Sequence, residues 1–186
     1  IALGAGLALA LASFDPSDPS LNSASARMAR NWLGWPGAYS ADLLLQSLGL
    51  AASLPPLALA AWGSHIIGRR MLGRLWSMVA LMPAAALLLA LAAAALPTPA
   101  MWPLRPGLGG FVGALALKSV AGIAGPNLGW VAIAAGVLGV ALSSYVVGLS
   151  ARRWGGVAAL VYDGIKDALR VALWALFTVM TRVAHD

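Results

Sequence analysis

The run LWSMVALMPAAALLLALAAAAL, residues 75–96, contains no ionisable side chain. As a helix it would rise about 33 Å, enough to cross a hydrocarbon layer roughly 30 Å thick. The whole chain has a similar character, since 61% of its 186 residues are hydrophobic and 10% are charged. Soluble domains carry about one quarter charged residues. We therefore predict an all-α integral membrane protein.

Apolar segments on both sides of this run bring the expected number of transmembrane helices to about four, at about 1–14, 42–67, 75–96 and 127–149. Since the chain opens on Ile1 and not on Met, the first helix is expected to begin before it. An alternative for this segment is a signal-peptide core, because Ala10-Leu11-Ala12 fits a cleavage site. Leu54-Pro55-Pro56 and Pro83 remove backbone donors and predict kinks in the second and third helices.

Two less apolar stretches, residues 15–41 and 97–126, are expected to form loops on the outer side of the membrane. The first is expected to hold a short interfacial helix at Arg27–Trp35. The second is expected to hold an interfacial or re-entrant helix, because Lys118 makes a full span unfavourable and the apolar residues share one helical face. Those residues are Leu108, Phe111, Leu115 and Val120. Residues 1–150 are thus predicted to form one four-span domain.

Basic residues in the short connections predict the orientation, because cytoplasmic loops are enriched in Lys and Arg. Three arginines at positions 69, 70 and 74 lie between the second and third helices, and two more at 152 and 153 follow the fourth. Both termini should therefore be cytoplasmic. Residues 151–186 are expected to form a cytoplasmic juxtamembrane part, with an amphipathic helix at 157–184 that leads to a linker. This helix either lies on the membrane, packs against a copy of itself or forms a fifth span, and its charges at 163–170 favour the first two.

Side chains suited to catalysis or metal binding are few. The chain has no Cys, and neither His65 nor His185 has ligand partners at a suitable spacing, so we predict no catalytic, cofactor-binding or metal site. Asp42 and Gln46 share one face at the expected start of the second helix, where the acid either couples ion movement or caps the helix. Arg105 and Lys118 either bind lipid head groups or an acidic loop of a partner, or reach the interface without a specific partner.

Small residues recur every four positions in the fourth apolar segment, at Ala135, Gly139 and Ser143. Such stripes let helix backbones approach closely in lipid. These three residues are therefore predicted to pack against another helix.

The first expected loop opens with SFDPSDPSLN, residues 13–22. Each proline disfavours helical geometry for the preceding Asp, and each Asp side chain can accept hydrogen bonds from nearby backbone N–H groups. Taken alone, this pattern predicts a stiff exit of the chain from the membrane.

Three motifs occur in order, FDPSDPS at Phe14–Ser20, GAYSADLLLQSLGL at Gly37–Leu50 and GLGGFVG at Gly107–Gly113, and a Gly-rich fourth segment follows them. Together they resemble the N-terminal four-span membrane domain of FtsK/SpoIIIE-type DNA translocases. The resemblance covers roughly residues 1–150.

The resemblance implies a membrane anchor and scaffold at the division septum of the bacterial inner membrane, in a protein that takes part in cell division and chromosome segregation. Its expected partners are other division membrane proteins, membrane lipid and further copies of itself, with six copies as one arrangement. The residues implied in partner binding are Asp15, Pro16, Asp18, Pro19, Asn22, Gly109, Gly110 and Gly113.

The resemblance also implies an ATP-driven motor, but no G-x-x-x-x-G-K-[ST] motif occurs in this chain. ATP, Mg²⁺ and nucleic acid are therefore expected to bind only outside this segment, which is not expected to be an enzyme. An alternative function is a small transporter or channel subunit that uses the proline-broken second helix and Asp42. Transporters are commonly built from internal repeats, and none is evident in this sequence.

Overall fold

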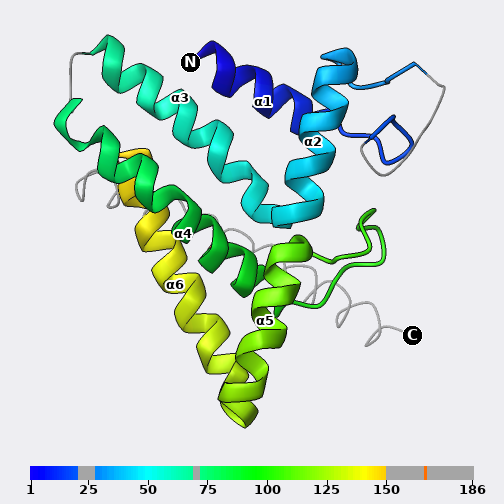
Figure 1. Ribbon diagram of the computed structural model, residues 1–186, viewed down its shortest axis with the longest axis vertical. Helices are drawn as coiled ribbons and strands as arrows, with labels where there is room; N and C mark the ends of the chain where they lie inside the picture. Colours follow the sequence, from blue (N-terminus) through cyan, green and yellow to red (C-terminus); the bar gives the residue numbers. More distant parts are fainter. Residues whose placement is uncertain (21–27, 69–71, 150–165, 167–186) are drawn as a thin grey trace, which may run out of the picture. The chain divides into compact units, whose positions relative to one another are not determined.

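The computed structural model describes residues 1–20, 28–68, 72–149 and 166. The regular elements in these residues are helical (Figure 1), which confirms the predicted all-α class. They are, in order, α1 (Ala2–Ala12), α2 (Gly34–Leu48), the 3₁₀ turn η1 (Gly49–Ser53), α3 (Leu54–Ile67), η2 (Leu72–Arg74), α4 (Leu75–Ala94), α5 (Gly110–Ala124), η3 (Gly125–Asn127) and α6 (Leu128–Val147).

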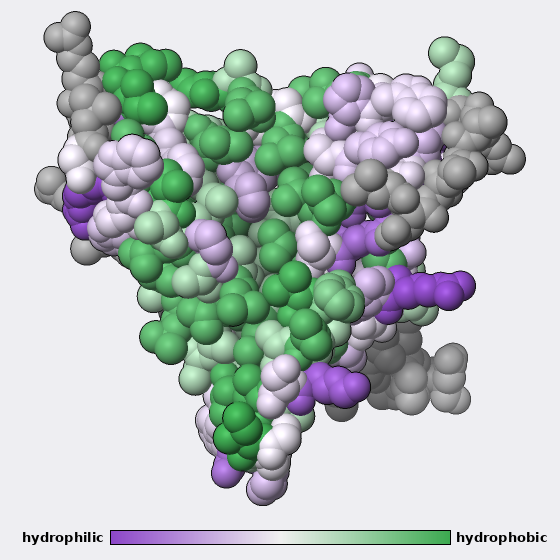
Figure 2. Space-filling view, in the orientation of Figure 1, coloured by the Kyte–Doolittle hydropathy of each residue, from purple (hydrophilic) through white to green (hydrophobic). Residues whose placement is uncertain are grey.

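Three helical stretches are long and apolar enough to cross a membrane, namely Gly34–Ile67, Leu75–Ala94 and Gly110–Val147, while α1 is apolar but shorter. Apolar residues cover most of the molecular face shown in Figure 2. On α6, the side chains of Ile133, Val137 and Leu138 are more than half exposed. Such a surface is suited to lipid, and the chain is a multi-pass membrane protein.

The helices of the unit Ile1–Gly148 form two groups, seen in blue to cyan and in green to yellow in Figure 1. In the first group α1 packs on α3 and α2, and in the second α4 packs on α6 and α5. A core of small and apolar residues joins the groups, made of Leu54 and Ala58 from α3, Ala85 and Ala86 from α4, and Val146 from α6.

The two groups contain the same backbone unit, repeated at a constant offset along the chain. In both, a helix of 15 residues begins with a glycine at positive φ, 64° at Gly34 and 65° at Gly110. Each helix ends at a second glycine, with φ and ψ of 58° and −128° at Gly49 and of 51° and −127° at Gly125. A 3₁₀ turn follows, with a proline in or just after it, and the chain continues into α3 or α6.

No internal repeat was expected from the sequence, so the repeated unit corrects that expectation. The two units share glycines at 34 and 110, at 37 and 113 and at 49 and 125, but they differ in most other side chains. Asp42 of α2 corresponds to Lys118 of α5, and Gln46 corresponds to Gly122. Hydropathy and charge therefore conceal a repetition that the backbone angles show.

The break between α2 and α3 starts at Gly49, before the predicted kink at Leu54-Pro55-Pro56, because only glycine readily adopts this combination of angles. The prolines instead occupy the first turn of α3, where backbone N–H groups have no partner within the helix.

The helix expected from residue 42 begins at Gly34. Residues 28–33 are not helical, so the expected interfacial helix at Arg27–Trp35 does not form there, and Gly34 and Trp35 belong to α2 instead. α5 lies within 97–126, where a helix was predicted. The amphipathic helix predicted at 157–184 lies outside the described residues, apart from Lys166.

Candidate binding site in the loops

The Asp-Pro-Ser turn that follows α1 is closed by Asp15. Its Oδ1 accepts hydrogen bonds from the Ser17 hydroxyl at 2.7 Å and from the Ser17 backbone N–H at 2.8 Å. Its Oδ2 lies 3.3 Å from the guanidinium of Arg30. The Ser17 hydroxyl bond, followed by the Ser17 N–H bond and the weaker effect of Arg30, holds the pKa of Asp15 below its ordinary value of 3.8. Asp15 is therefore ionised at neutral pH and stiffens the turn.

Asp18 fixes the two ends of the first loop to each other. Its carboxylate accepts the backbone N–H of Arg30 at 2.7 Å and that of Asn31 at 2.9 Å, and its side chain is 5% exposed. Charge-assisted bonds of this kind are stronger than neutral ones. Asp18 and the buried Pro19 are therefore engaged within the chain, while Pro16 and Ser17 stay exposed.

Asn31 connects the same loop to the end of α1 and was not among the predicted site residues. Its Nδ2 donates to the carbonyls of Ala10 at 2.8 Å and Ser13 at 3.2 Å, and its Oδ1 accepts the backbone N–H of Leu33 at 3.1 Å. A single polar residue in a loop follows no hydrophobic period, so the sequence carried no signal for it. Asn22, predicted as a binding residue, lies outside the described residues.

A cleft of about 320 Å³ lies between this loop, α2 and the second loop, residues 95–109. Pro16, Asp42 and Gln46 line it from the first loop and α2, and Arg105 lines it from the second loop. Asp42 is 8% exposed, and its Oδ1 accepts a hydrogen bond from Gln46 Nε2 at 2.6 Å. An acid and a base from separate elements thus reach one cleft, which suits an occupant that carries both polar donors and acceptors.

The position of Asp42 also corrects one interpretation. Because α2 begins at Gly34, Asp42 lies in the middle of the helix and not at its N-terminus. It therefore cannot cap the helix, and its carboxylate faces the cleft instead.

The glycines of the second loop and α5 lie against other helices. Gly109, Gly110 and Gly113 are buried. A Cβ atom on Gly110 would lie 2.6 Å from the backbone nitrogen of Gly49, and one on Gly113 would lie 2.7 Å from the carbonyl carbon of Ala90. These glycines let α5 approach α2 and α4, and a partner has no direct access to them.

The small-residue stripe of α6 serves packing inside the chain. Ala135 and Gly139 are buried, and a Cβ atom on Gly139 would lie 3.0 Å from the backbone nitrogen of Leu89 on α4. The hydroxyl of Ser143 is buried without a hydrogen-bond partner. Close approach of α4 and α6 thus depends on this stripe.

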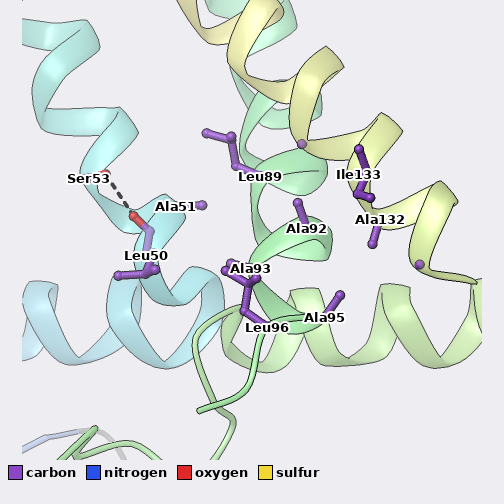
Figure 3. Close-up of a pocket in the computed structure, with 12 residues that line it drawn as sticks. Leu50, Ala51, Ser53, Leu89, Ala92, Ala93, Ala95, Leu96, Ala132 and Ile133 are labelled. Atoms are coloured by element: carbon purple, nitrogen blue, oxygen red, sulfur yellow. Dashed lines mark hydrogen bonds between the residues drawn. The ribbon is translucent and has the colours of Figure 1, made fainter. Parts of the chain in front are cut away.

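A second cavity, of about 550 Å³, lies between η1, α4 and α6. Figure 3 shows Leu50 and Ala51 of η1, Leu89 and Ala92 of α4, and Ile133 of α6 around it. No ionisable side chain lines this groove, and its one polar side chain, Ser53, donates its hydroxyl to the carbonyl of Leu50 at 2.8 Å, so the groove offers mainly apolar contact. In the described parts of the chain no three His, Asp or Glu side chains gather as a metal site would require.

The last turn of α6 is held by two residues of α3. Trp62 Nε1 donates to the carbonyl of Val146 at 2.7 Å, and His65 Nε2 lies 3.3 Å from the carbonyl of Val147. The last carbonyls of a helix have no partner within it, so these contacts complete its hydrogen bonding. One residue earlier, the hydroxyl of Tyr145 lies 2.8 Å from the hydroxyl of Ser77 on α4.

Comparison with known proteins gives a consistent result. The family described as the 4TM region of DNA translocase FtsK/SpoIIIE matches residues 1–161. A DNA translocase FtsK of Agrobacterium fabrum is 34% identical over 158 residues, which are 84% of this chain and 17% of that protein. The DNA translocase FtsK of Bradyrhizobium diazoefficiens is 38% identical over 130 residues, 68% of this chain and 15% of that protein.

The DNA translocase FtsK of Caulobacter vibrioides is 38% identical over 127 residues, 65% of this chain and 15% of that protein. The chain thus spans less than one fifth of the length of each of these relatives. No solved structure matches it.

Proposed function

Because the chain belongs to the four-transmembrane region of the FtsK/SpoIIIE DNA translocases, we propose that it anchors a longer translocase at the division septum and binds other division membrane proteins there. The matched region is the membrane region of these proteins. The motor that uses ATP and Mg²⁺ to move DNA belongs to other parts of the full-length protein. Both termini lie on the cytoplasmic side of the inner membrane, and the loops that precede α2 and α5 lie on its outer side, as the arginine distribution predicts.

The observation that carries the scaffold proposal is the hydrogen bonding within the loop cluster, defined as residues 13–20, 28–33 and 95–109. Asp18 and Asn31 tie the first loop to itself and to α1, and the cleft beside Asp42 separates it from Arg105. Preorganised loops bind partners with a smaller loss of conformational entropy than flexible ones. An exposed Pro16–Ser17 edge next to a cleft with both charges is a suitable surface for an extended segment of a partner protein.

In this proposal the predicted site residues divide into two kinds. Asp15, Pro16 and Arg105 contact the partner, and the buried residues Asp18 and Gly110 hold the surface in shape. Lipid surrounds the helices, and further copies of the chain lie beside it.

Depletion of the native protein in a bacterium whose division depends on it would test the proposal. Expression of residues 1–186 should restore normal cell length. The variant Arg105→Glu should leave cells filamentous, because it reverses the charge of one wall of the cleft and repels an acidic group of the partner. Met101→Glu is the matched control, since Met101 is 90% exposed in the same loop and does not line the cleft.

Both variants must reach the membrane in amounts equal to those of the unmodified chain. Rescue by Arg105→Glu at full strength would remove the cleft from the proposal. Failure of the unmodified segment, inserted in normal amounts, would contradict the scaffold function itself.

A small transporter or channel subunit is the second candidate, and the repeated backbone unit favours it, since transporters commonly consist of repeats with broken helices. Asp42 would then be its ion-coupling group. Proton or cation flux into liposomes that contain the chain, compared with the Asp42→Asn variant, tests this function. Equal flux in both and in empty liposomes would exclude it.

A further inference from the structure

Inside the chain, the end of the first repeated unit contacts the start of the second. The start of the first unit and the end of the second remain available for an equivalent contact. We propose that a second copy of this chain docks there head to tail, with the η3 end of one copy against the α1–α2 end of the next. This inference rests on the repeat and deepens the proposed scaffold function by naming the surface between copies.

The contact inside the chain joins the end of α2 to the start of α5, and we call it the inner junction. The backbone N–H of Leu50 donates to the carbonyl of Leu108 at 2.8 Å. Leu108 is 9% exposed, and a Cβ atom on Gly49 would lie 2.7 Å from the nitrogen of Gly110. Four residues after Leu50, at the start of α3, Leu54 is 3% exposed and packs in one cluster with Ala85 and Ala86 of α4. The junction is therefore a close backbone contact with apolar residues buried around it.

The corresponding residues at the start of the first repeated unit and at the end of the second are exposed. Trp32 corresponds to Leu108 and is 72% exposed, and Trp130 corresponds to Leu54 and is 73% exposed. Gly34 and Gly125, which correspond to Gly110 and Gly49, would have nothing within 4 Å of an added Cβ atom.

The 3₁₀ turns differ in the same way. η1 buries three residues against its surroundings and packs on α4, while η3 has no buried residue. α1 takes the place of α4 in the first group, because α1 packs on α3 as α4 packs on α6. Its outward residue Leu3 is 72% exposed. The η3 end thus exposes the counterparts of the residues that η1 and the start of α3 bury. The α1–α2 end exposes the counterparts of the residues of α5 and its preceding loop that contact η1.

One residue limits how closely the contact between copies can match the inner junction. Pro126 occupies the position of Leu50 and has no backbone N–H, so the bond from Leu50 to Leu108 has no counterpart. The contact between copies is therefore weaker than the inner junction and reversible. A head-to-tail contact between identical chains uses two different surfaces, and it closes into a ring if the rotation between copies permits.

Disulfide cross-linking tests this arrangement directly, because the natural chain has no Cys. One variant carries Trp32→Cys and the other Pro126→Cys, and the two are expressed together in one membrane. The expected result is a mixed disulfide dimer that neither variant forms alone, and a ladder of oligomers from a chain that carries both changes. Val137→Cys, at a position 65% exposed on α6, is the control partner for Trp32→Cys.

Two outcomes would overturn the inference. If Trp32→Cys alone cross-links as strongly as the mixture, the contact uses the same surface on both copies. If the mixture gives no more dimer than the Val137→Cys control, lipid and not a second copy covers these ends.

A second variant, Pro126→Leu, restores the missing donor and should tighten association by roughly two- to twelvefold in a dilution series in liposomes, the effect of one hydrogen bond. Unchanged or weaker association would contradict the correspondence between Pro126 and Leu50. Rescue of cell division without cross-linking would overturn this inference alone, whereas cross-linking without rescue would contradict only the proposed scaffold function.

Discussion

The substitution Asp18→Asn should open the first loop and expose the Arg30–Asn31 peptide bond to trypsin. The Asp18 carboxylate accepts the backbone N–H groups of both residues, at 2.7 and 2.9 Å, and is 5% exposed. An amide of the same shape keeps one acceptor and turns its NH₂ group toward the other N–H. One charge-assisted bond is lost and one buried donor is left without a partner, so the loop should be destabilised by about 2–4 kcal/mol.

Proteolysis of a transiently open segment follows its equilibrium population when closing is faster than cleavage. The expected loss raises the open population, and hence the rate of cleavage after Arg30, by about 30- to 900-fold. The assay is tryptic digestion of the detergent-solubilised chain, with cleavage after Arg74 as the internal reference. Ser17→Ala, which loosens only the exposed Asp15 turn, is the matched control and should change the rate far less. A rate for Asp18→Asn within threefold of the unmodified chain would refute the assigned role of the carboxylate.

Three further outcomes follow from the packing and the charges. Gly113→Ala should lower the free energy of unfolding by about 1–3 kcal/mol in a denaturant titration, because its Cβ overlaps an α4 carbonyl group, whereas Gly122→Ala in open space should raise it by about 0.5–1 kcal/mol. Trp62→Phe should cost about 1–3 kcal/mol in the same titration, since the Val146 carbonyl loses its 2.7 Å donor, and an unchanged midpoint would show that water replaces it. The pKa of Asp15 is lowered in the folded chain, so its contribution to loop closure should be constant above about pH 5 and fall as pH drops below 3.8. Hydrogen exchange of the loop amides across about pH 2.5–6 measures this opening. A loss of protection that already begins above about pH 5 would contradict the prediction.

The sequence predicted the apolar helices well because hydropathy reports directly on the cost of placing side chains in lipid. The helix at 75–96 is found as α4 (Leu75–Ala94), and the helical content of 97–126 is found as α5. Prolines were less informative than expected, since Pro55 and Pro56 begin α3 and the chain breaks earlier, at Gly49. Whether a glycine takes a positive φ depends on its tertiary surroundings, which composition does not record.

In the loop cluster, too, the sequence predicted the local pattern but not the contacts between distant residues. The sequence predicted correctly that the aspartates of the Asp-Pro-Ser turn accept backbone N–H groups. Asp15 and Asp18 nevertheless have similar local patterns and different roles. Their roles differ because the chain returns to them at Arg30 and Asn31. Asp15 pairs with the exposed side chain of Arg30, whereas the buried Asp18 accepts the backbone N–H groups of both residues. Asn31 itself was missed, because its partners at Ala10 and Ser13 are distant in sequence and no motif joins them.

The contacts at the end of α6 bear on how the chain withstands mechanical force. A pull on Gly148 directed along α6 first loads the last carbonyls of that helix, and Trp62 and His65 pass this load to α3 while Ser77 passes it to α4. The long α4–α6 contact then resists as a sheared interface, in which many contacts must yield together, and not as a seam that opens one contact at a time. A membrane anchor built in this way spreads tension over three helices at the point where the chain leaves the unit.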